Sequence, residues 1–217
     1  MKKYEMIRCH FGLFRLKALV DIPRYNVKAG DLGGLIEKED NLEHNGDCWC
    51  EKNSCIFGNA RVSGNALITD NAEIFGNAKV SWNAYIGGSA KIYGNAEIYG
   101  DVKVTGESQI FGDAKLSESV IVSGGVKIFD NASLSGTSCA SDRVKIHGNA
   151  TLTDKASALN SASIFDNAKM YNNASISDVS QVYGNAELYD DAKVSGQAKV
   201  AGDSKLKGDT EIHVEVE

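Results

Sequence analysis

The chain has 217 residues, of which 42% are apolar and 24% are charged, and its formal net charge at pH 7 is −6. No stretch reaches the ~18 to 20 consecutive apolar residues that a membrane-spanning helix requires, and the N-terminal residues lack the apolar core and cleavage site of a secretory signal. Five cysteines, an odd number without an export signal, favour reduced thiols and a cytoplasmic protein.

Charge is unevenly divided along the chain. Residues 1–29 carry seven Lys or Arg and two acidic residues, a balance of +5, and the other 188 residues carry 16 basic and 27 acidic ones, a balance of −11. Binding to a nucleic-acid backbone depends on basic side chains. The acidic body therefore argues against direct nucleic-acid binding.

The first 45 residues lack the repeat described below and are expected to form a basic cap. Residues 13–22, LFRLKALVDI, follow a turn at residues 10–12 and alternate in polarity, which is typical of a strand with one buried face. We predict a β-hairpin here, followed by a glycine-rich lead-in around Gly30, Gly33 and Gly34. Such a cap would cover the backbone edge and core that the end of a repeat array exposes.

Residues 58–213 divide into 26 hexapeptides without an insertion. One position, first occupied by Val62, is Val, Ile, Leu or Met in 24 of them, and another, first occupied by Ala60, is always small. Because side chains alternate between the faces of a strand, the aliphatic residue points inward and its neighbours point outward. Gly, Asn and Asp suit tight corners, so each hexapeptide predicts a short strand and a corner. Residues 46–57 fit as degenerate units, and 214–217 form a short charged tail.

A second period, of eighteen residues, fixes the number of sides. Serine and other hydroxyl residues dominate one register, which begins at Ser63, whereas another register is aromatic: Phe57, Phe75, Tyr93, Phe111, Phe129, His147, Phe165 and Tyr183. Residues eighteen apart therefore share an environment, so three hexapeptides complete one turn. The sequence predicts an all-β triangular parallel solenoid, a β-helix of about nine coils over residues 46–213.

Two alanines interrupt the aliphatic position. Ala140 and Ala158 fall on the same inner face. Three outcomes are open: a void, filling by Val126 and Val144 at an adjacent corner, or a local irregularity near residues 136–160.

The pattern aliphatic-x-Gly-Asn-Ala-x resembles the hexapeptide repeat of left-handed parallel β-helix proteins. The lead-in KAGDLGGLIEKEDNLEHNGDCW (28–49) resembles that of an uncharacterised bacterial and prophage group in this superfamily. Members of the group are often labelled acyltransferases or polymer-forming proteins. The resemblance implies a left-handed coil, and it leaves two alternative functions open, an oligomeric acyl-CoA-dependent acyltransferase and a self-assembling filament.

Catalytic and metal chemistry find little support. The related acyltransferases use a histidine base and a loop projecting from the coil, but the repeat has no inserted loop and His147 stands in the aromatic register. A zinc site for hydration chemistry, such as that of the similar-looking γ-type carbonic anhydrases, would need three converging histidines. The body carries only His147 and His213. The repeat frame points Cys48 and Cys50 inward and Cys55 outward, so these thiols do not converge. We expect no catalytic residue, metal or cofactor.

Exposed apolar side chains are the strongest functional signal. The aromatic register is expected on the outside, where it would form either an interface or a stack that stabilises the sheet. Contiguous apolar surface and aromatic enrichment are typical of protein interfaces. A second candidate patch, on another side, comprises Trp49, Leu67, Trp82, Tyr85 and Ile121.

We therefore expect a rigid, non-enzymatic binding or scaffold protein with a protein partner, and a homo-oligomer. The prophage-like lead-in implies a narrower hypothesis. On this hypothesis the chain is a phage accessory protein that binds and inhibits a host defence protein.

Overall fold

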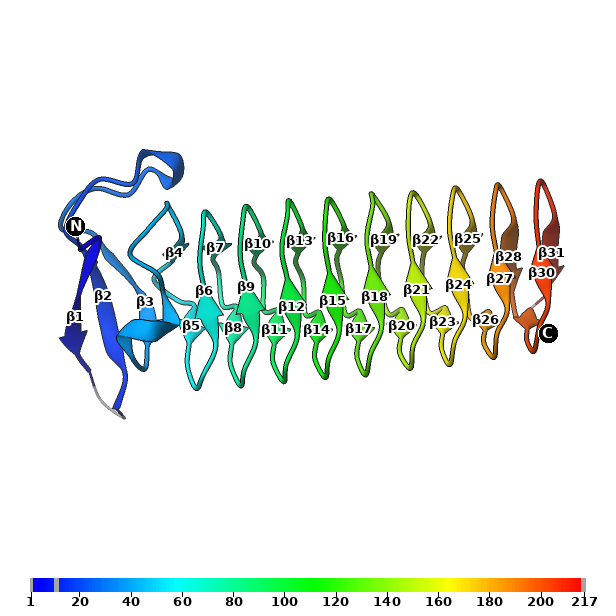
Figure 1. Ribbon diagram of the computed structural model, residues 1–217, viewed down its shortest axis with the longest axis horizontal. Helices are drawn as coiled ribbons and strands as arrows, with labels where there is room; N and C mark the ends of the chain where they lie inside the picture. Colours follow the sequence, from blue (N-terminus) through cyan, green and yellow to red (C-terminus); the bar gives the residue numbers. More distant parts are fainter. Residues whose placement is uncertain (1, 10–11, 216–217) are drawn as a thin grey trace.

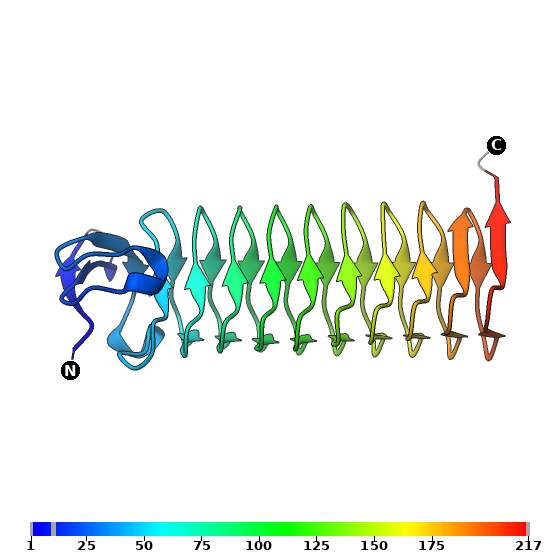
Figure 2. The ribbon, with the colours of Figure 1, turned by 90° about the horizontal axis from the view of Figure 1, so that it is seen from above.

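Short strands recur at every hexapeptide and coil into a rod, with the N-terminal segment folded at one end (Figures 1 and 2). This computed structural model describes residues 2–9 and 12–215. Part of the turn predicted at residues 10–12 and the end of the tail, residues 216–217, lie outside the described residues. The chain is an all-β parallel solenoid built from three sheets, which confirms the predicted fold class.

Each sheet runs along one side of the rod. The first contains β1 (Tyr4–Arg8), β2 (Phe14–Ala18), β3 (Leu32–Ile36), β5 (Cys55–Ile56), β8 (Glu73–Ile74), β11 (Lys91–Ile92), β14 (Gln109–Ile110), β17 (Lys127–Ile128), β20 (Lys145–Ile146), β23 (Ser163–Ile164), β26 (Gln181–Val182) and β29 (Lys199–Val200). The second contains β4 (Trp49–Cys50), β7 (Leu67–Ile68), β10 (Tyr85–Ile86), β13 (Lys103–Val104), β16 (Ile121–Val122), β19 (Cys139–Ala140), β22 (Ser157–Ala158), β25 (Ser175–Ile176), β28 (Lys193–Gly196) and β31 (Glu211–Val214). The third contains β6 (Arg61–Val62), β9 (Lys79–Val80), β12 (Glu97–Ile98), β15 (Lys115–Leu116), β18 (Ser133–Leu134), β21 (Thr151–Leu152), β24 (Lys169–Met170), β27 (Glu187–Leu188) and β30 (Lys205–Leu206).

The eighteen-residue turn is confirmed by the strand register. Ile92 pairs in parallel with Ile74 on one side and Ile110 on the other. The rod has about ten coils, because the coiling begins earlier than the repeat motif. β3 already pairs in parallel with β5, and Leu42 bridges Val62 in parallel, so an irregular first coil lies within the segment assigned to the cap. The left hand of the coil stays an expectation from the resemblance.

The corners show why Gly-Asn recurs. The first residue of the pair takes the left-handed backbone, as Gly76 does with a φ of 69°. The following asparagine then donates its side-chain amide to the equivalent residue of the next coil, as Asn77 Nδ2 does to Asn95 Oδ1 at 2.9 Å. Its backbone N–H also bonds across the coils, from Asn77 to the Gly94 carbonyl at 2.8 Å. Each corner is therefore tied to its neighbour by side chain and backbone.

The core is a single aliphatic and alanine cluster that runs along the rod. Strand pairing continues without interruption through β19 and β22, so the irregularity considered near residues 136–160 is absent. Ala140, Ala158, Val126 and Val144 are all buried in this cluster.

The N-terminal segment forms the predicted hairpin. β1 and β2 pair antiparallel, and β2 pairs antiparallel with β3, so the hairpin continues the first sheet past the first coil. Between β2 and β3 the chain makes an arm that contains the 3₁₀ helix η2 (Pro23–Tyr25), and a second, η3 (Glu39–Asn41), follows β3. Within the described residues, neither helix has the length or apolar character needed to cross a membrane.

Candidate protein-binding surfaces

The aromatic register forms one continuous column of stacked rings along the rod. Each ring lies directly after a strand of the first sheet, and adjacent ring centroids are 4.7 to 5.2 Å apart with planes within 6° of parallel. The column, half-buried throughout, consists of Phe57, Phe75, Tyr93, Phe111, Phe129, His147, Phe165 and Tyr183. The structure thus places these eight residues together on the outside of one side, in the predicted register.

The column presents ring edges outward, because the ring faces cover one another. Nucleic-acid bases that stack on proteins need an open ring face, so the column is a poor platform for them. Lysines flank it on the same sheet: Lys91 pairs with Glu73 at 3.0 Å, whereas Lys127 and Lys145 are register neighbours without a carboxylate within ion-pair distance in the described residues. The side is therefore an apolar ridge with lysines along one border and, at Asp130 and Asp166, carboxylates along the other.

Trp82 is the most exposed large apolar side chain in the described part of the chain, at 67%. It sits at the corner between β9 and β10 and holds the left-handed backbone, with a φ of 61°. Glycine fills the equivalent corner on the coils before and after it, at Gly64 and Gly100. The tryptophan therefore projects from a corner position that is glycine on both adjacent coils and Gly, Asn, Asp or, at Glu118, Glu on the others.

Tyr99, one coil further on, stands beside Trp82. It is 42% exposed, and the two rings border a hollow of about 250 Å³ together with Lys79, Ser81 and Glu97. Lys79 and Glu97 form an ion pair at 2.8 Å across the floor. This pair of aromatic side chains, Trp82 and Tyr99, is hereafter the corner pair. The sequence singled out Trp82 but missed Tyr99, which stands in the hydroxyl register and lies one coil away in space.

The expectation that Trp49 is exposed is wrong, because it is 2% exposed. The cap covers it: a Cβ added at Gly33 would stand 2.6 Å from the indole, and Tyr25 and Val27 of the arm and Leu32 of β3 border a hollow together with it. Repeat geometry placed Trp49 on an outer face, and it could not reveal that the arm folds over that face.

The rest of the predicted second patch is only partly contiguous, with Leu67 and Tyr85 side by side in the register. Leu67 is half-buried against the core, and Tyr85 is half-buried with the Lys103 amine 5.4 Å from its ring centroid. Ile121 is 50% exposed, but Lys103 separates it from Tyr85 in the register. Trp82 lies with Tyr99 on the neighbouring corner instead.

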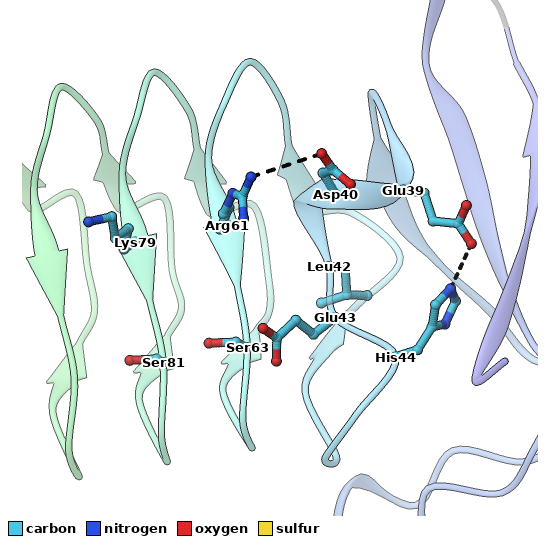
Figure 3. A pocket seen from close by; sticks show the side chains of 9 residues that line it. All are labelled: Glu39, Asp40, Leu42, Glu43, His44, Arg61, Ser63, Lys79 and Ser81. Atoms are coloured by element: carbon cyan, nitrogen blue, oxygen red, sulfur yellow. Dashed lines mark hydrogen bonds and ion pairs between the residues drawn. The ribbon is translucent and has the colours of Figure 1, made fainter. Parts of the chain in front are cut away.

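A further hollow lies between the lead-in and the third sheet (Figure 3). Its volume is about 380 Å³, and it is lined by η3 and the residues after it on one side and by the first two strands of the third sheet on the other. His44 Nε2 lies 2.8 Å from Glu39 Oε1, and His44 Nδ1 accepts the Lys3 backbone N–H at 3.2 Å. Lys2 and His44 lower the pKa of Glu39 by hydrogen bonding to it. Both ring nitrogens of His44 are thus occupied in holding the cap together, and sequence reasoning had no signal for this hollow.

The two other histidines in the described part of the chain, His147 and His213, also have structural partners. His147 stacks between Phe129 and Phe165, as predicted. His213 Nδ1 lies 2.9 Å from Ser195 Oγ, but both are on the outer surface of the last two coils. A general base and nucleophile act in a pocket that also binds the substrate, and none of the hollows described above includes this pair.

The cysteines take the orientations expected of them. Cys48 and Cys50 are fully buried and Cys55 is half-buried. Burial raises the pKa of all three thiols, that of Cys50 to about 12. Across residues 2–9 and 12–215, no three His, Cys, Asp or Glu side chains are grouped as metal ligands would be.

The fold and these surfaces define the class of protein, a parallel β-solenoid with an N-terminal cap and exposed aromatic side chains. Comparison with known proteins adds no closer assignment: the chain matches no protein-family model and no curated protein.

Proposed function

We propose that this chain is a rigid, non-enzymatic binding protein that docks a protein partner through its corner pair. The observation that carries the proposal is Trp82, 67% exposed and held in a left-handed backbone conformation.

The fold alone gives no reason for a tryptophan at this corner. A bulky residue at positive φ is an outlier that costs roughly 1–3 kcal/mol. A buried ring would offset that cost through packing, but most of the Trp82 surface is in solvent. A partner that covers the ring supplies the missing contact, and tryptophan and tyrosine are enriched among the residues that dominate binding energy.

Hydrogen bonds of the next residue, Asn83, fix the backbone that carries Trp82. The adjacent Asn83 accepts a hydrogen bond from Arg24 Nη2 at 3.0 Å and another from Asn65 Nδ2 at 3.1 Å, and it donates to Asp101 at 2.8 Å. Its backbone N–H also bonds to the Gly100 carbonyl. A partner would therefore order few additional groups on binding, which lowers the entropic cost of association.

The aromatic column is a second contact surface in this proposal. Its flanking Lys127 and Lys145 would bring like charges together if two copies met face to face, so a partner with carboxylates around an apolar groove fits the column better. Self-association of this chain stays a prediction, which sedimentation of the purified protein checks. The resemblance to a prophage group favours a host defence protein as the partner.

Affinity capture from a bacterial host lysate tests the proposal with Trp82→Gly. Glycine is the natural residue of neighbouring corners, so this variant removes the ring and relieves the backbone. We expect it to raise the free energy of unfolding by about 1 kcal/mol and to abolish recovery of partners. For an isolated partner, calorimetry should show binding at least ~30-fold weaker.

The matched control is Ile121→Ser, which removes a 50% exposed apolar side chain from the second sheet, two coils beyond Tyr85. This variant should recover the same proteins as the wild type. Equal recovery by the wild type and Trp82→Gly would refute docking through the corner.

A further inference from the structure

A lysine and a cysteine meet inside the junction between cap and coil. Lys3 is only 4% exposed, and its amine lies 3.1 Å from the sulfur of Cys48, which is fully buried. The amine's other partner is the Gly46 carbonyl at 3.2 Å. In the described residues no carboxylate lies within 4.0 Å of the Lys3 amine, so this buried amine has a thiol where a buried lysine ordinarily has an acid.

The backbone holds the two groups in contact. The Lys3 N–H donates to His44 Nδ1, and the Lys3 carbonyl accepts the Leu19 N–H at 2.9 Å. On the other side, the Cys48 N–H donates to the Gly64 carbonyl at 2.9 Å. Burial raises the pKa of the Cys48 thiol, and the charge and hydrogen bond of the Lys3 amine oppose that effect.

We propose that Lys3 and Cys48 are a covalent modification site, at which an oxidant joins the lysine nitrogen to the cysteine sulfur through one oxygen atom. A single inserted oxygen suits two atoms that already lie 3.1 Å apart. A direct sulfur–nitrogen bond would require a much closer approach of two tightly packed residues.

The reaction balances with dioxygen as the oxidant. The S–H bond of Cys48, one N–H bond of Lys3 and the O–O bond break, and an S–O and an O–N bond form. Sulfur and nitrogen together lose four electrons, dioxygen gains them, and the second oxygen atom leaves as water with the two hydrogens. Peroxide gives the same product, with two peroxide molecules reduced to three waters. Either oxidant is small and uncharged, as access to a buried thiol requires.

The product would lock the cap to the coil. Lys3 directly precedes β1 and Cys48 directly precedes β4, so the bond closes a loop across 45 positions of the chain. Cross-links stabilise a fold chiefly by restricting the unfolded chain, more so for longer loops. The oxidised protein should therefore unfold at a higher temperature than the reduced protein.

Mass spectrometry of the full chain tests the proposal after exposure to air or hydrogen peroxide and, in parallel, under a reductant. We expect the oxidised protein to gain one oxygen and lose two hydrogens. Tryptic digestion should then yield residues 3–8 joined to residues 39–52, because trypsin does not cleave after a modified Lys3. Dithiothreitol should release the two peptides.

The chain provides its own control, since Cys50 is equally buried but contacts the Ser54 hydroxyl at 3.1 Å instead of an amine. Cys50→Ala should keep the cross-link, and Cys48→Ser and Lys3→Arg should lose it. A Cys48 that stays a free thiol in the oxidised wild type, forms a sulfenic or sulfinic acid without Lys3, or bonds directly to nitrogen overturns the proposal. The wild-type result decides the matter even if a variant fails to fold.

Discussion

Single residues at the cap and the corners carry the features that distinguish this chain from a regular repeat. Trp82 takes the place of a corner glycine, and Tyr4 fills a core position at the cap with its hydroxyl 2.6 Å from the Leu42 carbonyl. Glu39 accepts from Lys2 and lies beside His44, whose ring centroid is 4.2 Å from that of Tyr4 with the two planes tilted by 31°. The cap is therefore stabilised by individual polar contacts, whereas the body is stabilised by the same strand pairing and corner hydrogen bonds in each coil.

The Glu39 contacts make a pH-dependent contribution to stability. Hydrogen bonds from Lys2 and His44 lower the folded-state pKa of Glu39 below its usual 4.5. A carboxyl whose pKa is depressed by folding stabilises the protein above its unfolded pKa, and this contribution disappears as the pH falls through the folded pKa. We expect Glu39→Gln to be less stable than the wild type at neutral pH, and the difference to be smaller at about pH 3, which is below the usual pKa of a glutamate.

Denaturant unfolding at both pH values measures this difference. Glu107→Gln is the control, because Glu107 is exposed and has no ion pair in the part of the chain that the structure describes. A Glu39→Gln deficit that is the same at both pH values would contradict the linkage.

At the scale of elements, the two-residue strands gain their stability from stacking along the rod. Each strand is too short to persist alone, and each gains partners in the coils before and after it. The aromatic column adds ring contacts to the same register as the backbone bonds. The column can both stabilise the sheet and form an interface, since the ring faces stack on one another and the ring edges point outward.

The position of a ring in the column should determine how much stacking energy it contributes to the stability of the fold. Phe111 stacks on Tyr93 at 4.8 Å and on Phe129 at 5.0 Å, whereas Phe57 has a single stacked neighbour, Phe75, in the described structure. At about 0.5–1.5 kcal/mol per aromatic pair, Phe111→Ala should lose roughly twice the stacking energy of Phe57→Ala. Hydrogen exchange of the flanking strands and denaturant unfolding report the two losses. Equal losses would show that the stacking energy does not depend on the number of stacked neighbours.

For the whole molecule, the hairpin determines whether the first coil presents an open edge. β2 pairs with β3, so removing residues 1–18 would expose the backbone of β3, and exposed strand edges promote association. We expect the shortened protein to associate in a concentration-dependent way and to unfold at a lower temperature, as light scattering and circular dichroism would show. Ile7→Ser, which alters an exposed hairpin side chain, should do neither.

The sequence by itself determined the coil, its three sides and the outward aromatic register. These features follow from side-chain alternation and from contacts between residues eighteen apart, so the residues of each hexapeptide are sufficient to predict them. Only the tertiary structure decided which outer positions stay open. Tyr99 borders the same hollow as Trp82 because the two residues lie on adjacent coils. Trp49 is covered and Lys3 meets Cys48 because the cap, which has no repeat, folds back over the first coils through contacts between residues distant in the chain.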